Sequence, residues 1–157
     1  MNPEKCIGTH HPRWFGLALQ ALVILSKNEV QKCPSVELAA QLQSEPTQLR
    51  RILATLAKGD ILETQEGRDG GYRLKRSADT ITLADVYKVL QVSDPLSSGI
   101  KETAGTHPFG IEMKSIFCEL TSEMDRSLVE TLSKYTIGQL SHRAFSCESQ
   151  RVDELKV

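Results

Sequence analysis

The sequence predicts a mainly α-helical fold with one small β-hairpin and a long C-terminal helix. Three observations support this fold class. Aromatic residues make up only 5% of the chain, whereas Leu, Ile, Val and Ala recur three and four positions apart in several segments, as amphipathic helices require. Glycines at positions 67, 70 and 71 separate two short strand-like runs. A continuous apolar stripe at helical spacing runs from Ile116 to Tyr135.

The first half of the chain predicts three helices. Apolar spacing predicts a buried helix from Trp14 to Ser26, followed by a loop over 28–34. Ser35 is expected to cap a second helix over 36–43. Pro46 is expected to open a third helix that Gly59 ends. The short turn before Pro46 makes the third helix cross the second and project its polar face outward.

The second half predicts a hairpin and a long helical segment. Residues 60–65 and 71–76 are expected to be strands, and Thr82 to begin a helix over 83–91. Residues 93–109, rich in Ser, Gly and Pro, are expected to form a linker loop. A dimerisation helix and C-terminal segment then covers 110–142, and the polar tail after His142 is expected to fray. The chain thus divides into a head over 13–92, a linker and a C-terminal segment.

Composition narrows the classes of function. The formal net charge of −1 gives no global signal for nucleic acid, although a local basic face remains compatible with it. No apolar run approaches the roughly 20 residues of a membrane helix, and the N-terminus lacks a signal-peptide pattern. We therefore expect a cytoplasmic protein without membrane contact. The histidines fall in the tail and loops, where they form no nucleophile–base set, so an enzyme is not expected.

The order helix, loop, helix, tight turn, helix, β-hairpin predicts a winged helix-turn-helix. In such motifs the third helix lies in the major groove of DNA. Its outward positions carry Thr47, Gln48, Arg50 and Arg51. Arg can bond guanine and Gln can bond adenine, so these residue types suit base reading. For this helix alone, a polar face that meets only water is an equally good interpretation.

The hairpin favours the DNA interpretation. Arg68 sits near its tip, where a narrow minor groove attracts such a side chain. Arg73, Lys75 and Arg76 follow and suit phosphates. A phosphate-binding loop is excluded because the glycines join two strands instead of opening a helix. We expect backbone contacts from Arg13, Ser35 and Lys75.

The run "LRRILATLAKGDILETQEGRDGGYRLKRSADTITLADVYKVLQ" carries a family resemblance. With its "GGYRL" and "ITLADVYKVL", and a later "TIGQL", it resembles the Rrf-type (IscR/NsrR/CymR-like) winged helix-turn-helix transcriptional regulators. The resemblance covers roughly 13–92 most closely. It implies a DNA-binding transcriptional regulator, expected to be a repressor, that binds a near-palindromic operator as a homodimer.

The apolar stripe of the long C-terminal segment suits that homodimer. A helix so apolar along one edge needs a surface that buries it. A second copy could supply the surface, since DNA-reading heads act as symmetric pairs, or the helix could fold back on its own head. The expected dimerisation residues are Ile116, Phe117, Leu120, Met124, Leu128, Leu132 and Tyr135.

The cysteines depart from the family pattern. Cluster-binding members carry three closely spaced cysteines before the long helix, whereas this chain has only Cys118 there. No iron–sulfur cluster or other cofactor is therefore expected, although His107 and Glu112 leave an unusual ligand set open. Cys118 is either a redox thiol or an inert packed one. Cys6 with His10 and His11 has only loose metal-ligand spacing, and no metal is expected there.

A second departure concerns the wing. Glu66 stands where family members often carry a basic residue, and its carboxylate would repel phosphate. Either Arg68 supplies the positive charge that family members often place at position 66, or this chain binds DNA more weakly than they do. The alternative function is a winged-helix protein-interaction adaptor without specific DNA binding. Salt dependence separates the two, because binding driven by phosphates weakens steeply as salt rises.

Overall fold

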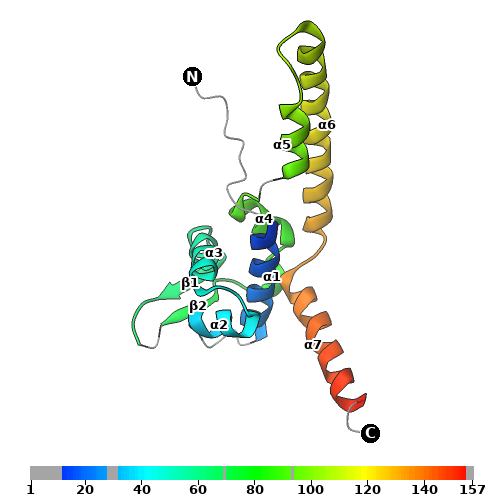
Figure 1. Ribbon diagram of the computed structural model, residues 1–157. Helices are drawn as coiled ribbons and strands as arrows, with labels where there is room; N and C mark the ends of the chain where they lie inside the picture. The colour runs from blue at the N-terminus through cyan, green and yellow to red at the C-terminus, as the bar shows by residue number, and fades with distance from the viewer. Residues whose placement is uncertain (1–11, 28–31, 69, 93, 155–157) are drawn as a thin grey trace.

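The computed structural model describes residues 12–27, 32–68, 70–92 and 94–154. Figure 1 shows a helical head with a hairpin on one side, from which the arm formed by α5 and α6 rises and α7 descends. The predicted fold class is confirmed: the described chain is mainly helical with one two-stranded hairpin. The elements are α1 Pro12–Lys27, α2 Ser35–Leu42, α3 Pro46–Lys58, β1 Leu62–Gln65, β2 Gly71–Leu74, the 3-10 helix η1 Ala78–Thr80, α4 Leu83–Leu90, α5 Pro95–Glu102, α6 Pro108–Ser133 and α7 Ile137–Glu154.

The core of the head forms where α1, α2, α3 and α4 meet the hairpin. Each helix turns the apolar face predicted from its spacing toward this core. Burying a Leu or Ile side chain completely stabilises a fold by roughly 1.5–3 kcal/mol, so these positions dominate the stability of the head. The large side chains that are fully buried include Leu22, Leu38, Leu49, Ile52, Leu53, Leu56, Ile61, Ile81, Leu90 and Ile137.

Local caps explain where the head helices begin. Thr82 starts α4 with a reciprocal capping box to Asp85, as its sequence position predicts. Pro46 is the first residue of α3 and Gly59 follows its last, so both predicted ends are confirmed. The prediction that Ser35 caps α2 is wrong. Pro34 occupies the cap position without a side-chain hydrogen bond, and Ser35 is the first helical residue.

The hairpin is antiparallel and is anchored to the helix-turn-helix. Its strands are shorter than predicted, with the register Leu62↔Leu74 to Gln65↔Gly71. The backbones of Cys33 and Tyr72 exchange two hydrogen bonds of 3.0 and 2.9 Å, which dock the segment before α2 on β2. Gly71 permits this approach, since a Cβ there would lie 2.7 Å from the carbonyl carbon and oxygen of Cys33. The turn itself uses Gly67 at φ +107°, a backbone conformation that side chains disfavour.

The segment predicted as a linker loop contains a helix. Residues 95–102 form α5, so the expectation of a continuous loop over 93–109 is wrong. The side chain of Asp94 accepts a hydrogen bond of 3.0 Å from the Leu96 amide, and α5 packs on α6. Capping and packing together stabilise a helix whose own residues include Ser and Gly.

The C-terminal segment contains the predicted long helix, α6, and a second helix, α7. A break at 134–136 separates α6 from α7, and α7 continues to Glu154, so the expected fraying after His142 is wrong. Thr136 and Gln139 form a reciprocal capping box at the start of α7. The break also docks on the head, since the Ile137 amide donates to the Ile81 carbonyl at 2.9 Å. Within the described ranges, every helix is too short or too polar to cross a bilayer.

Candidate nucleic-acid interface

The outward face of α3 carries the predicted base-reading residues. Thr47, Arg50 and Arg51 are exposed, and Gln48 is partly exposed, while the opposite face of the helix is buried in the core. Helical periodicity alone produces this division, because Leu49, Ile52, Leu53 and Leu56 hold the inner face. The helix therefore presents a continuous polar surface at its first two turns.

The structure brings two of the predicted DNA-contacting residues together. The Arg50 guanidinium donates a hydrogen bond of 3.4 Å from Nε to the Ser35 hydroxyl. Ser35 begins α2, so this contact joins the start of α2 to the outward face of α3. Arg13 is exposed in the first turn of α1.

The basic residues of the wing are mostly engaged in ion pairs. Arg73 pairs with Glu63 across the hairpin at 2.8 Å, and Arg76 pairs with Asp85 at 3.1 Å. By contrast, Arg68 is exposed at the wing tip and makes no ion pair within the part of the chain that the structure describes. Arg68 is therefore the wing cation most readily available to DNA.

Lys75 is held by Asp60. Its ammonium lies 2.7 Å from the Asp60 carboxylate, at the turn between α3 and β1. This hydrogen bond and the charge of Lys75 lower the pKa of Asp60, and the same contact raises the pKa of Lys75. Both groups face solvent, so the pair can exchange for a phosphate at little cost.

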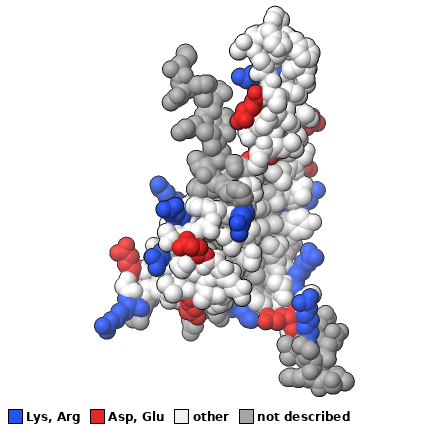
Figure 2. Space-filling model, viewed as in Figure 1, with Lys and Arg blue, Asp and Glu red and all other residues white. Residues whose placement is uncertain are grey.

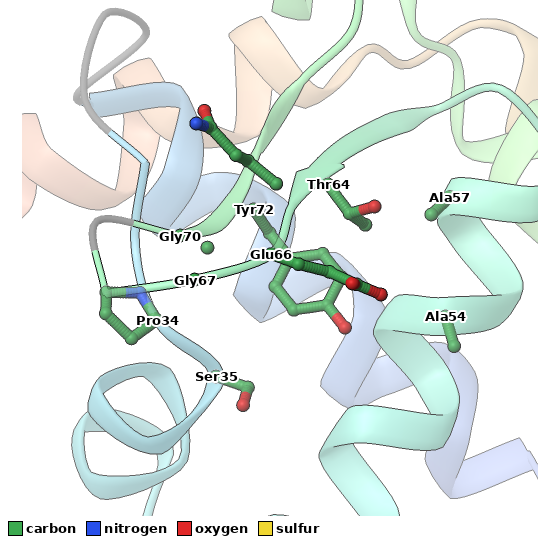
Figure 3. A pocket seen from close by; sticks show the side chains of 11 residues that line it. Pro34, Ser35, Ala54, Ala57, Thr64, Glu66, Gly67, Gly70 and Tyr72 are labelled. Atoms are coloured by element: carbon green, nitrogen blue, oxygen red, sulfur yellow. The ribbon is translucent and has the colours of Figure 1, made fainter.

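A groove of about 440 Å³ separates the wing from α3 (Figure 3). Ala54 and Ala57 line the α3 side, and the Glu66 side chain points from the wing toward them (Figure 3). Glu66 makes no ion pair with a described residue. The carboxylate predicted to repel phosphate thus lies inside the candidate interface.

Lys32 is a basic residue near the wing that the sequence pattern does not indicate. Lys32 donates a hydrogen bond from Nζ to the side-chain carbonyl of Gln65, at the end of β1. These residues are 33 positions apart, so only the folded hairpin brings them together. Lys32 adds a cation beside the wing whose hydrogen-bond partner is a neutral amide.

Charges of both signs share the surface of the head. Figure 2 shows Lys and Arg side chains next to Asp and Glu on the head and wing, while the upper part of the arm is largely uncharged in this view. On this face the cations are interspersed with carboxylates and form no broad basic field.

An aromatic contact connects the head to the arm. The rings of Phe15 on α1 and Tyr87 on α4 meet edge to face with centroids 5.8 Å apart. The Tyr87 hydroxyl donates a hydrogen bond of 3.4 Å to Asp125 on α6. Burial, followed by the charge of Asp125, raises the pKa of Tyr87. This contact joins α1 and α4 of the head to α6.

The predicted dimerisation stripe lies mainly on the open side of α6. Ile116, Leu120 and Leu128 are 51%, 45% and 41% exposed, and Phe117 and Met124 are partly exposed. Leu132 instead packs against the head core. Tyr135 falls in the break after α6, so it does not extend the stripe along the same helix. Phe109, which is highly exposed and seven positions before Ile116, extends the stripe in the other direction.

The described cysteines lie on different elements. Cys33 lies at the bridge to β2, whereas Cys118 and Cys147 are exposed on α6 and α7. Burial, followed by the charge of Glu37, raises the pKa of the Cys33 thiol, which keeps it protonated at neutral pH. Cys6, His10 and His11 lie outside the described residues.

Residues 13–143 match the Rrf2 family, which is described as iron-dependent transcriptional regulators. The chain belongs to this family. It is accordingly a helix-turn-helix transcriptional regulator of a DNA-binding family, and not an enzyme. The resemblance noted from "GGYRL" and "ITLADVYKVL" is confirmed.

Relatives and solved structures agree with this assignment. YffB of Lactococcus lactis, a candidate HTH-type transcriptional regulator, is 26% identical over 138 residues, or 82% of this chain and 83% of that protein. YwnA of Bacillus subtilis, also a candidate HTH-type regulator, is 25% identical over 131 residues, or 83% and 96%.

The solved structures share the fold. A candidate regulator from Lactobacillus plantarum has a TM-score of 0.68 at 23% identity, covering 88% of this chain and 97% of that one. T. potens IscR has a TM-score of 0.62 at 19% identity, covering 83% and 85%.

Among the residues that the structure describes, none form a set that fits the iron that the family description implies. Cys118 supplies the one thiol in the described segment 94–133, and two other side chains there with ligand atoms, Asp94 and His107, serve as helix caps. His107 Nδ1 accepts a hydrogen bond of 3.3 Å from the Gly110 amide, and Asp94 caps α5. Gly110 itself packs on the Gly105 backbone, which closes the turn. Within the described ranges, no group of three or more His, Cys, Asp or Glu side chains is placed to hold a metal ion.

Proposed function

We propose that this chain is a homodimeric, sequence-specific transcriptional repressor that binds a near-palindromic operator. This proposal rests on the polar, outward face of α3, which lies beside the wing. Thr47, Gln48, Arg50 and Arg51 would read base edges in the major groove, since Arg suits guanine and Gln suits adenine.

Contacts outside the major groove would position the head. Arg68 would enter the minor groove, where a narrow groove concentrates negative potential. Arg13, Ser35 and Lys75 would contact the backbone, with Lys75 exchanging Asp60 for a phosphate. The DNA-facing hydroxyl of Ser35 also holds Arg50, so the two would act together.

Pairing of α6 between two copies would create the symmetric reader. The exposed stripe of Ile116, Leu120 and Leu128 supports this part of the proposal, because a contiguous apolar patch on a monomer marks an interaction surface. A two-fold axis through the stripe would place two heads on two half-sites, as a near-palindrome requires. Bound at an operator in the cytoplasm, the dimer would exclude RNA polymerase.

A signal received by the arm would change the angle between the heads. The Phe15–Tyr87–Asp125 contact supports this route, since it joins α1 and α4 of the head to α6. A small tilt at this contact would alter the spacing of two α3 helices and therefore the fit to two half-sites.

The second candidate function is a protein-interaction adaptor that uses the same polar face. Two observations support this second function. Glu66 places a carboxylate in the groove, and Arg73, Lys75 and Arg76 are already paired with carboxylates. The two functions differ in their response to salt. Specific DNA binding that neutralises several phosphates loses affinity steeply as salt rises, with a slope of about −0.9 per phosphate in a log–log plot.

Selection from a random double-stranded DNA pool tests the proposed function. We expect the full-length protein to recover a near-palindrome, and anisotropy titrations on that sequence to show a steep salt slope. Arg51→Ala should remove specific binding, whereas Arg126→Ala, an equal loss of charge on the exposed part of α6, should leave it intact. Recovery of no sequence, or an Arg51→Ala protein with unchanged affinity and site preference, would contradict the proposal.

A further inference from the structure

The first turn of α3 holds a carboxylate where a DNA-reading helix commonly offers free amides. The Glu45 side chain accepts hydrogen bonds from the Thr47 amide at 2.9 Å and the Gln48 amide at 2.6 Å. Pro46 has no amide hydrogen, and the Leu49 amide donates to the Glu45 carbonyl at 3.1 Å. The amides of Thr47, Gln48 and Leu49 are therefore satisfied within the chain.

This carboxylate is charged and exposed. Hydrogen bonds from the Thr47 and Gln48 amides, and then the nearby Arg51 charge, lower the pKa of Glu45. It remains ionised at neutral pH, on the end of the helix whose early residues would meet the bases. Its two oxygens offer about four acceptor sites, and the cap uses two of them.

An ionised acceptor at this point restricts what DNA can present to it. A helix N-terminus ordinarily binds a phosphate through free amides and the helix dipole. Here a phosphate would meet a carboxylate, and the Thr47 and Gln48 amides are already bound to that carboxylate. In the major groove, only the N4 amino group of cytosine and the N6 amino group of adenine are donors, whereas guanine and thymine present O6, N7 and O4 acceptors.

Capping alone does not require a glutamate. Ser, Thr, Asp and Asn are the preferred caps, and a Ser would satisfy an amide without bringing a charge to the DNA side. Glu45 accordingly adds a negative charge and outward acceptor sites that the fold of α3 does not need.

We propose that Glu45 is a specificity-determining residue that selects an amino-bearing base, cytosine or adenine, opposite the start of α3 and rejects phosphate there. This inference rests on the proposed reading of DNA by α3. It assigns to Glu45 the exclusion of guanine and thymine at one position of each half-site. It also makes Glu45 a restraint on non-specific binding, because the residue repels the backbone that non-specific complexes use.

The test compares full-length wild type with Glu45→Ser, Glu45→Thr and Glu45→Asp. Ser and Thr keep a cap and remove the charge, whereas Asp keeps both, and two neutral variants guard against a folding failure of one. Glu130→Ser, on the exposed part of α6, is the control for loss of a surface carboxylate. Each protein is subjected to selection from the same random duplex pool and then titrated on the wild-type consensus, its single-base variants and a scrambled duplex.

We expect wild type and the control to require cytosine or adenine at one position per half-site, with at least about a fivefold loss for guanine or thymine. The neutral variants should lose this preference and bind the scrambled duplex roughly threefold more tightly or better, while Asp should stay close to wild type on the scrambled duplex. If the neutral variants keep the wild-type base preference and affinity, the role of Glu45 is overturned, while the proposed function still stands. Wild type that selects no sequence would overturn both this inference and the proposed function.

Discussion

Asp85 ties two parts of the head together through a single carboxylate. It accepts hydrogen bonds from the Thr82 amide at 3.0 Å and from Arg76 at 3.1 Å. Its own amide donates to the Thr82 hydroxyl at 3.1 Å, which completes the capping box of α4. Arg76 follows β2, so Asp85 links the end of the wing to the helix that contacts α6.

Asp85→Ala should lower the free energy of unfolding by about 1 kcal/mol, as the loss of a helix cap does. The ion pair with Arg76 contributes little to this loss of stability, because solvent screens it. Although burial raises the pKa of Asp85, hydrogen bonds from Thr82 and Arg76 lower it overall. Its contribution is therefore present above the unfolded pKa of about 3.9 and is lost as the pH falls through the lower folded value.

Urea denaturation at pH 7 and pH 3 checks this prediction. The difference between wild type and Asp85→Ala should be smaller at pH 3. Glu130→Ala, which removes an exposed carboxylate of α6, should change stability little at either pH. An equal difference at both pH values would show that the charge of Asp85 is not responsible.

At the scale of residues, the sequence predicts which side chains face outward but not which of them are already paired. Thr47, Arg50 and Arg51 follow from helical spacing, because the apolar positions of α3 leave them only the other face. The pairing of Arg73 with Glu63 depends on the strand register, and that of Lys75 with Asp60 depends on the turn between α3 and β1. No local pattern encodes either contact.

The wing is an element held in place by one close approach. Gly71→Ala would place a Cβ 2.7 Å from the Cys33 carbonyl, so the Cys33–Tyr72 bridge would have to open. We expect a loss of roughly 2 kcal/mol in stability and weaker DNA binding, since Arg68 would lose its position relative to α3.

Gly99→Ala is the matched control for the wing prediction. Its Cβ would meet no atom within 4 Å, and it lies inside α5, where Ala is favoured over Gly by up to about 1 kcal/mol. Thermal or urea unfolding and anisotropy titrations of both variants measure the two effects. Equal stability and DNA affinity of Gly71→Ala and wild type would show that the bridge does not anchor the wing.

At the scale of elements, strong apolar periodicity predicted helices well and helix breaks poorly. The four head helices have buried stripes and recognisable ends, and they lie close to the predicted bounds. α5 lacks such a stripe, since "PLSSGIKE" contributes no buried residue, and its stability depends on Asp94 and α6. The break before α7 is concealed because apolar spacing continues through Leu132 and Tyr135. The Thr136–Gln139 capping box was the available signal for it.

At the scale of the whole molecule, the arm carries an apolar surface that the head of the same chain does not bury. α4 and α5 pack on α6, whose buried residues are Gly110 and Thr121. The neighbouring side, with Ile116 and Leu120, stays exposed. The fold-back alternative therefore accounts for Leu132 but not for the upper stripe, which stays exposed in this chain.

The final prediction concerns the exposed stripe and uses two faces of one helix. Leu120→Asp puts a charge on the stripe, whereas Ile111→Asp puts the same charge nine positions earlier, on the opposite side of α6. Both side chains are exposed, at 45% and 59%, so neither change should unfold the head. A charge desolvated at the proposed interface costs several kcal/mol, which should convert Leu120→Asp to a monomer.

Sedimentation velocity and titrations on DNA check the two consequences together. Wild type and Ile111→Asp should sediment as dimers and bind a two-half-site duplex much more tightly than a single half-site. Leu120→Asp should sediment as a monomer and bind both duplexes alike, because the second head no longer binds as part of one assembly. A dimeric Leu120→Asp protein would exclude the stripe as the dimer contact. A monomeric Leu120→Asp protein that keeps the full preference for the two-half-site duplex would show that this preference does not depend on pairing of α6.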